Sequence, residues 1–173
     1  MRRFFSAATV MLLALGCART PTETPQQRHA DLYRAFRSID GAIAMGVTHL
    51  QLGELLQRAA TQVAISGDTT KAQDEVAMVK SYTEALEAYA DSQKLWAKQI
   101  SYASEAYAKG FIPVEAPIME IPKKYGLSEV ERKLSWGTSK WIHEEGAVQA
   151  VWNAAEKKAE AARREYFALG AKH

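Results

Sequence analysis

The sequence predicts an all-α protein, an elongated three-helix bundle with coiled-coil-like seams. Three observations predict this fold. Polar tetrapeptides typical of helix N-termini precede three long segments, apolar residues in those segments recur at alternating steps of four and three, and the segments match in length. At about 40 residues each, the helices would be about 60 Å long. Helices of equal length can bury their apolar stripes against one another, which stabilises a bundle.

Composition and charge restrict the class of protein. The chain has 173 residues, of which 47% are hydrophobic and 24% charged, as in ordinary globular domains. Ten Gly, five Pro and one Cys exclude collagen-like, disordered and disulfide-scaffold proteins. There are 22 basic and 20 acidic side chains, but Arg2 and Arg3 lie in a segment that we expect to be removed, which leaves 20 of each. A neutral domain does not attract nucleic acid, so we expect no such partner.

Residues 1–16 have the order of a secretory signal peptide. Arg2 and Arg3 precede an uncharged, mostly apolar run from Phe4 to Leu15. This run is too short to span the apolar core of a bilayer, which needs about 20 residues. Small residues and the single cysteine of the chain follow it. The segment therefore predicts export rather than a transmembrane helix.

The end of this segment, Leu13-Ala14-Leu15-Gly16-Cys17, resembles the lipobox of bacterial lipoproteins. The resemblance implies that Cys17 becomes the first mature residue and carries the lipid. Two or three acyl chains such as palmitate are enough for stable anchoring. In this class, Ala18 in place of Asp implies the periplasmic face of the outer membrane of a Gram-negative bacterium, with residues 17–23 as a short tether. The alternative is an ordinary cleaved signal peptide followed by a free thiol.

We expect residues 24–173 to form a single helical domain, with the first helix over 25–65. Thr24 to Gln27 forms a capping box, and Pro25 suits the first helical position because its missing N–H is not needed there. The alternative is a kink near 41–46, because each Gly lowers helix propensity by about 1 kcal/mol relative to Ala. The predicted buried stripe consists of Leu32, Phe36, Ile39, Ile43, Gly46, Leu50 and Gly53.

We expect the second helix over 71–109, after the capping box Thr70 to Gln73. Its predicted seam begins at Val76 and is only modestly apolar. Beside the seam, a strip of aromatic residues recurs every seven positions, and Gly110 is well placed as the C-terminal cap. The strip consists of Tyr82, Tyr89 and Trp96.

The third helix is expected over 129–169, after the capping box Ser128 to Glu131. The connection 110–127 contains three prolines, which exclude a regular helix. It is apolar and long, and long connections are often functional. We expect an up-down-up order of helices, although an extended connection is also long enough for the second and third helices to run parallel.

The best candidate for a contact surface combines one face of the third helix with the apolar connection. Trp136 lies off the predicted seam, and His143, seven residues on, shares its helical face with Lys140 between them. Trp is enriched among the residues that dominate binding energy at interfaces. From the connection we add Phe111, Ile112, Ile118 and Met119. The remaining tryptophans lie on or beside the seams and are expected in the core: Trp96, Trp141 and Trp152.

No motif predicts catalysis or a cofactor. The four His lack metal-ligand spacing, and on a helix the adjacent His143, Glu144 and Glu145 would point about 100° apart. Motifs of serine hydrolases, nucleotide-binding loops and dinucleotide-binding folds are absent from the sequence. We therefore expect a non-enzymatic interaction, scaffold or chaperone-like lipoprotein, bound to the membrane by lipid and to an envelope protein or another copy of itself. The alternatives are a binder of a small apolar or glycan ligand, with Trp and Tyr between helices, and an exclusion or immunity lipoprotein.

Overall fold

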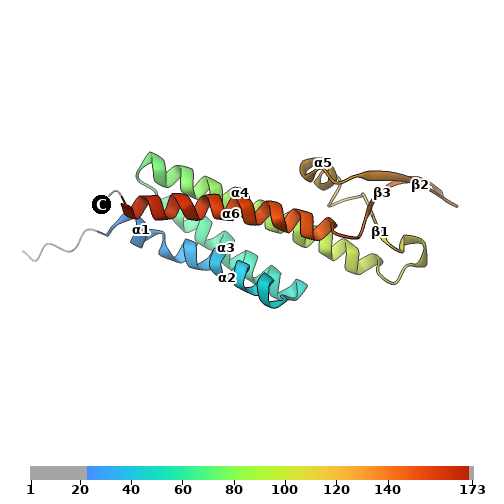
Figure 1. The fold of residues 1–173 in the computed structure, drawn as a ribbon, viewed down its shortest axis with the longest axis horizontal. Helices are drawn as coiled ribbons and strands as arrows, with labels where there is room; N and C mark the ends of the chain where they lie inside the picture. Colours follow the sequence, from blue (N-terminus) through green and yellow to red (C-terminus); the bar gives the residue numbers. More distant parts are fainter. Residues whose placement is uncertain (1–22, 172–173) are drawn as a thin grey trace, which may run out of the picture.

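The computed structural model describes residues 23–171, which form an elongated molecule (Figure 1). The chain is mostly helical, as the sequence predicts, and it also contains a small three-stranded sheet that the sequence analysis missed. The predicted signal peptide and the lipid attachment site Cys17 lie outside the described residues. Within 23–171, none of the helices is both long and apolar enough to cross a membrane.

Long helices lie side by side along most of the molecule, and the sheet occupies one end (Figure 1). Turns of three residues, 46–48 and 70–72, join the first three long helices, so neighbours in sequence run antiparallel. The last helix returns along α4 and ends beside the short first helix. The helices of this bundle are α1 (Pro25–Arg28), α2 (Ala30–Met45), α3 (His49–Thr69), α4 (Gln73–Tyr102) and α6 (Ala147–Ala171).

The prediction of one continuous helix over 25–65 is wrong. Its capping box at Thr24 is present, but the chain reverses direction between α2 and α3 instead of only kinking. Gly46 ends α2 with φ of +89°, a left-handed conformation that favours glycine. Thr48 then starts α3 with a second capping box, in which its hydroxyl accepts from the backbone N–H of Gln51. The reversal leaves Leu50, a predicted seam residue, exposed.

The second predicted helix corresponds to α4 with shifted ends and a shifted buried face. Thr70 does not cap it, because its hydroxyl donates to the carbonyl of Ser66 in the preceding helix, at 2.7 Å. The helix ends at Tyr102, and a 3-10 turn, η1 (Ala106–Ala108), follows. Tyr82 and Tyr89 from the aromatic strip are buried, whereas the predicted seam residue Val76 is exposed.

The prediction of a third helix over 129–169 is wrong for its first half. Residues 129–143 form a hairpin, in which half-buried and exposed residues alternate along its first strand. This period of two is the signature of a strand. From Ala147 onward the chain is helical, and the predicted stripe from Ala155 to Leu169 is buried as expected. The new elements are β1 (Phe111–Pro113), α5 (Ile121–Tyr125), β2 (Glu129–Leu134) and β3 (Gly137–His143).

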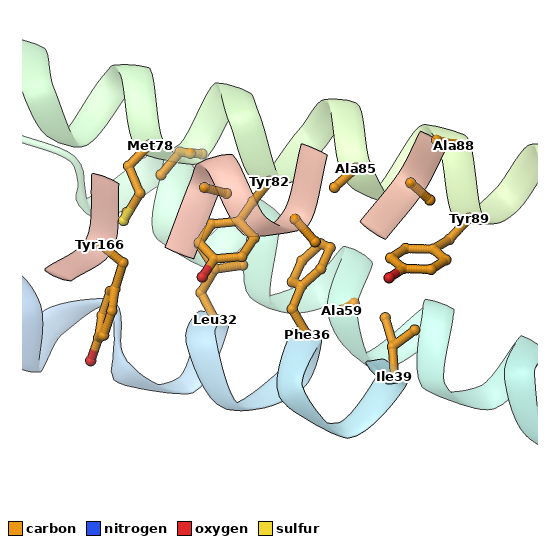
Figure 2. Close-up of a cluster of buried hydrophobic side chains, with 14 of the residues drawn as sticks. Leu32, Phe36, Ile39, Ala59, Met78, Tyr82, Ala85, Ala88, Tyr89 and Tyr166 are labelled. Carbon is orange, nitrogen blue, oxygen red and sulfur yellow. The ribbon is translucent and has the colours of Figure 1, made fainter. Parts of the chain in front are cut away.

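The main core lies where α2, α3, α4 and α6 meet, and Figure 2 shows how its side chains pack together. Alanines on α4 and α6 leave room for large rings, so that Phe36 and Tyr82 approach to 4.6 Å between ring centroids. A second, smaller core lies where the sheet and α5 pack on α4 and α6. Its fully buried residues include Leu95, Ile112, Ile118, Ile142 and Val151.

Asp91 of α4 connects the two parts of the molecule. Its carboxylate accepts hydrogen bonds from Lys124 at 2.7 Å and from the hydroxyl of Tyr125 at 3.1 Å, both on α5, and from Lys94 at 3.0 Å. Burial opposes ionisation of this carboxyl, but these hydrogen bonds outweigh it and hold the pKa of Asp91 below its ordinary value. The contacts fix α5, and with it the second core, against the bundle.

Candidate contact surface at the sheet end

The sheet has the order β1-β3-β2 with antiparallel neighbours, and its two faces differ in chemistry. Since side chains alternate along a strand, Ile142 and Lys140 of β3 point to one face, and His143 and Trp141 to the other. Ile142 packs into the second core, so the first face is turned toward the helices. The opposite face carries aromatic and basic groups and is the candidate contact surface.

Four aromatic residues, from α4, η1, β3 and the loop between β2 and β3, gather at this end of the molecule. Tyr107 of η1 lies edge-on to Trp136, with ring centroids 5.2 Å apart, and edge-on to Trp141 at 6.3 Å. Tyr102, at the end of α4, lies 6.5 Å from Tyr107. Trp136 occupies the short loop between β2 and β3 and is 68% exposed, whereas Trp141 is buried. A small cavity of about 150 Å³ opens between these rings.

Arg132 of β2 lies across the same face of the sheet. Its guanidinium carbon is 4.4 Å from the ring centroid of Phe111 and 5.0 Å from that of Trp141. Cation–π contacts of this kind contribute about 0.5–2 kcal/mol each, depending on exposure. The Nη1 atom is buried and has no hydrogen-bond partner among residues 23–171. His143 adds its ring at 4.7 Å from Phe111.

Two ion pairs lie near the candidate contact surface, one beside it and one on the opposite face of the sheet. The carboxylate of Glu115 accepts hydrogen bonds from Lys98 at 2.6 Å and from the hydroxyl of Tyr102 at 2.9 Å, and these bonds hold the pKa of Glu115 below its ordinary value. On the other face of the sheet, Lys140 donates to Glu129 at 2.7 Å, which raises the pKa of Lys140. The basic charge of Lys140 is therefore already paired within the hairpin.

The structure brings together only part of the predicted contact surface. Trp136 and His143 are exposed at the sheet end, and Met119 is 58% exposed in the turn before α5. Phe111 is half-buried beneath Arg132. The expectation that Trp136, Lys140 and His143 share one face is wrong, because it assumed a helix, whereas Lys140 and His143 lie on opposite faces of a strand.

Two other predicted surface residues belong to the core. Ile112 and Ile118 have no exposed area, since both pack between the sheet and the helices. The sequence does not predict Tyr107 and Arg132 at this surface, and it predicts Trp141 on a helix seam. The alternation of Val130, Arg132 and Leu134 before Gly137 was the available signal for a hairpin.

The bundle itself contains open pockets but no metal-binding cluster. No group of three His, Cys, Asp or Glu side chains within residues 23–171 is arranged to hold a metal ion. One open depression of about 430 Å³ is lined by His49, Gln93 and Lys98 among others and by no Trp or Tyr. A pocket of about 210 Å³ between α2 and α6 is lined in part by Tyr89 and Trp152.

Comparison with known proteins identifies no relative of this chain. The chain matches no protein-family model, no curated protein sequence and no solved structure. The residues of the contact surface therefore carry the evidence for function. At the sheet end these are an exposed indole in contact with further rings, a stacked guanidinium and a histidine, groups that can bind a partner by stacking and hydrogen bonds.

Proposed function

We propose that this protein is a lipid-anchored periplasmic protein of the bacterial outer membrane that binds another envelope component through its sheet end. The role is non-enzymatic, either as a scaffold or as a chaperone-like partner. The observation that carries the proposal is Trp136, a large exposed ring supported from beneath by Tyr107. Exposed aromatic residues held on a rigid element are typical centres of protein interfaces.

The position of this surface supports the proposal. Helix α1, the first described helix after the lipid attachment site expected at Cys17, lies at the opposite end of the molecule from the sheet (Figure 1). The 30 residues of α4 connect the two ends, and at 1.5 Å per residue they span about 45 Å. A bundle anchored at its N-terminal end would thus carry the sheet end away from the membrane, toward a periplasmic partner.

A second candidate function is the binding of a small ligand between the helices. The pocket of about 210 Å³ supports it, because Tyr89 and Trp152 contribute to its walls. The indole N–H of Trp152 is buried and has no hydrogen-bond partner among the described residues. Quenching of tryptophan fluorescence by a ligand, lost in Trp152→Phe, is the expected result for this candidate.

Cross-linking in intact cells tests the main proposal. The full chain is captured by affinity after cross-linking, and its partners are identified by mass spectrometry. We compare the wild type with Cys17→Ala, Trp136→Ala and the matched control Phe167→Ala, which truncates another exposed ring near the C-terminal end of α6.

One envelope protein should be recovered with the wild type and with Phe167→Ala. Its recovery should fall at least about fivefold with Trp136→Ala, the effect expected for an interface residue of central importance. It should disappear with Cys17→Ala, because the anchor places the protein beside its partner. Unchanged recovery with Trp136→Ala would exclude the sheet end as the binding surface.

A further inference from the structure

The sheet has one open edge. β1 is three residues long, contains Pro113 and packs against α4 and η1. β2, at the other edge, is six residues long, and within residues 23–171 no strand pairs with its outer side. Every second residue of such a strand directs its backbone N–H and C=O groups outward, ready to pair with another strand.

The order of charges along β2 identifies the strand that fits this edge. Glu129 and Glu131 occupy its first half, and Arg132 and Lys133 its second half. We propose that two copies of this chain pair through antiparallel β2 strands, related by a two-fold axis at Arg132, to form one continuous six-stranded sheet. Glu131 of each copy then lies opposite Lys133 of the other copy.

The same register also matches the apolar residues. Val130 of each copy lies opposite Leu134 of the other, on the face that bears Arg132. Opposite charges and apolar pairs directly across an antiparallel ladder both stabilise it. Glu131 and Lys133 are exposed and form no ion pair within residues 23–171. Lys140 lies opposite Glu131 in the ladder with β3, but it donates to Glu129, so Glu131 can still pair with Lys133 across the axis.

This register places Arg132 of one copy opposite Arg132 of the other, where two positive charges would repel each other. The conformation of the side chain avoids this repulsion. Its guanidinium lies over Phe111 and Trp141, which belong to β1 and β3, and so points away from the open edge. The two positive charges therefore stay apart. A register centred on Glu131 would instead place two carboxylates opposite each other, and like charges in such pairs destabilise a sheet.

Charged side chains on an edge strand generally prevent unwanted pairing. On β2 the charges are segregated rather than mixed, so they oppose most partner strands and favour an antiparallel copy of the same strand. The inference is independent of the proposed function, because it uses the edge of the sheet rather than its aromatic face, and it does not require the lipid anchor.

A charge exchange between two tagged copies tests this pairing. Two full-length chains with different tags are expressed together, solubilised in a large excess of mild detergent micelles, and captured through one tag while the other is measured. The combinations are wild type with itself, Glu131→Lys with itself, Lys133→Glu with itself, and Glu131→Lys with Lys133→Glu. Lys80→Glu and Glu87→Lys, exposed positions on α4, are the matched charge controls.

Wild-type copies and both controls should capture each other. Each β2 variant paired with itself places like charges opposite at two equivalent sites and should lose at least about tenfold of the captured partner. The mixed pair restores opposite charges at both sites and should recover capture. Absence of wild-type capture, equal capture in all combinations, or no recovery in the mixed pair would overturn the proposal. Circular dichroism and thermal unfolding of each variant establish that the chains are folded.

Discussion

Tyr82 and Tyr89 lie seven residues apart on α4, and both are fully buried beside α2 (Figure 2). Their hydroxyl groups have different surroundings. The hydroxyl of Tyr89 donates to Asp40 at 2.9 Å, and Asp40 also pairs with Arg163. The hydroxyl of Tyr82 is buried with no partner among residues 23–171. Burial raises the pKa of both phenols, so both remain neutral at ordinary pH.

Removal of the two hydroxyls should therefore have opposite effects on stability. Tyr82→Phe deletes an unpaired buried polar group and should raise the free energy of unfolding by up to about 1 kcal/mol. Tyr89→Phe removes a hydrogen bond and leaves Asp40 with one partner fewer. This variant should lower the free energy of unfolding by about 1–2 kcal/mol. Urea unfolding of both variants and the wild type measures the difference. Effects of the same sign would contradict the assigned hydroxyl environments.

At the scale of the secondary-structure elements, four similar tetrapeptides differ in whether they cap a helix. Thr24 and Thr48 begin sequences that form capping boxes at helix starts. Thr70 bonds backward to the preceding helix, and Ser128 precedes a strand. A capping motif stabilises a helix start only where the following segment buries a helical stripe, so the motif alone does not locate a helix.

Because only some of these tetrapeptides cap a helix, removal of the first hydroxyl should lower the free energy of unfolding by different amounts at different sites. Thr48→Ala removes the hydroxyl that accepts from Gln51 at the start of α3, and should lower the free energy of unfolding by about 1 kcal/mol. Ser128→Ala, at an exposed position outside any helix, should change it by less than about 0.5 kcal/mol. Urea unfolding again provides the measurement. Equal losses in the two variants would argue against the observed ends of α3 and β2.

The sequence predicts the helical elements where burial follows a strict period, as from Ala155 to Leu169. It fails at 129–143 because Leu134, Thr138 and Trp141 happen to follow a helical spacing. Only Trp141 of these three is buried, and it lies opposite Pro113 of β1, a segment far away in the sequence. Of the candidate site, Trp136, His143 and Phe111 are predicted from the sequence, and Trp136 is singled out because it lies off every predicted seam. The contact of Tyr107 with Trp141 depends on η1 and β3 meeting in space, which no local pattern encodes.

For the molecule as a whole, acid stability depends on buried carboxylates at separate places in the bundle. Glu75 at the start of α4 is almost fully buried, and its carboxylate lies 2.6 Å from Arg28 and 2.8 Å from Nε2 of His29. Burial opposes its ionisation, but the hydrogen bonds with His29 and Arg28 outweigh this and lower the pKa of Glu75 below 4.5. Asp91, between α4 and α5, has a lowered pKa for a similar reason.

A lowered pKa means that the folded protein binds fewer protons in acid than the unfolded chain does. Each carboxylate therefore contributes stability above its unfolded pKa, which is 4.5 for Glu75 and 3.8 for Asp91. This contribution disappears as the pH falls through the lower folded value. The free energy of unfolding should be nearly constant from about pH 7 to about pH 5 and should fall steeply below about pH 4.5.

Glu75→Gln should show how much the Glu75 carboxylate contributes to the loss of stability in acid. The amide cannot ionise and leaves Arg28 without its buried partner, so the variant should lose about 2 kcal/mol of unfolding free energy at pH 7. Its stability should then decline less than that of the wild type between pH 5 and pH 3, because one of the two titrating carboxylates is gone. Glu87→Gln, an exposed position on the same helix, should follow the wild-type pH profile. Urea unfolding at pH 7, 5, 4 and 3 measures both profiles, and a Glu75→Gln profile parallel to the wild type would show that acid destabilisation does not arise at this carboxylate.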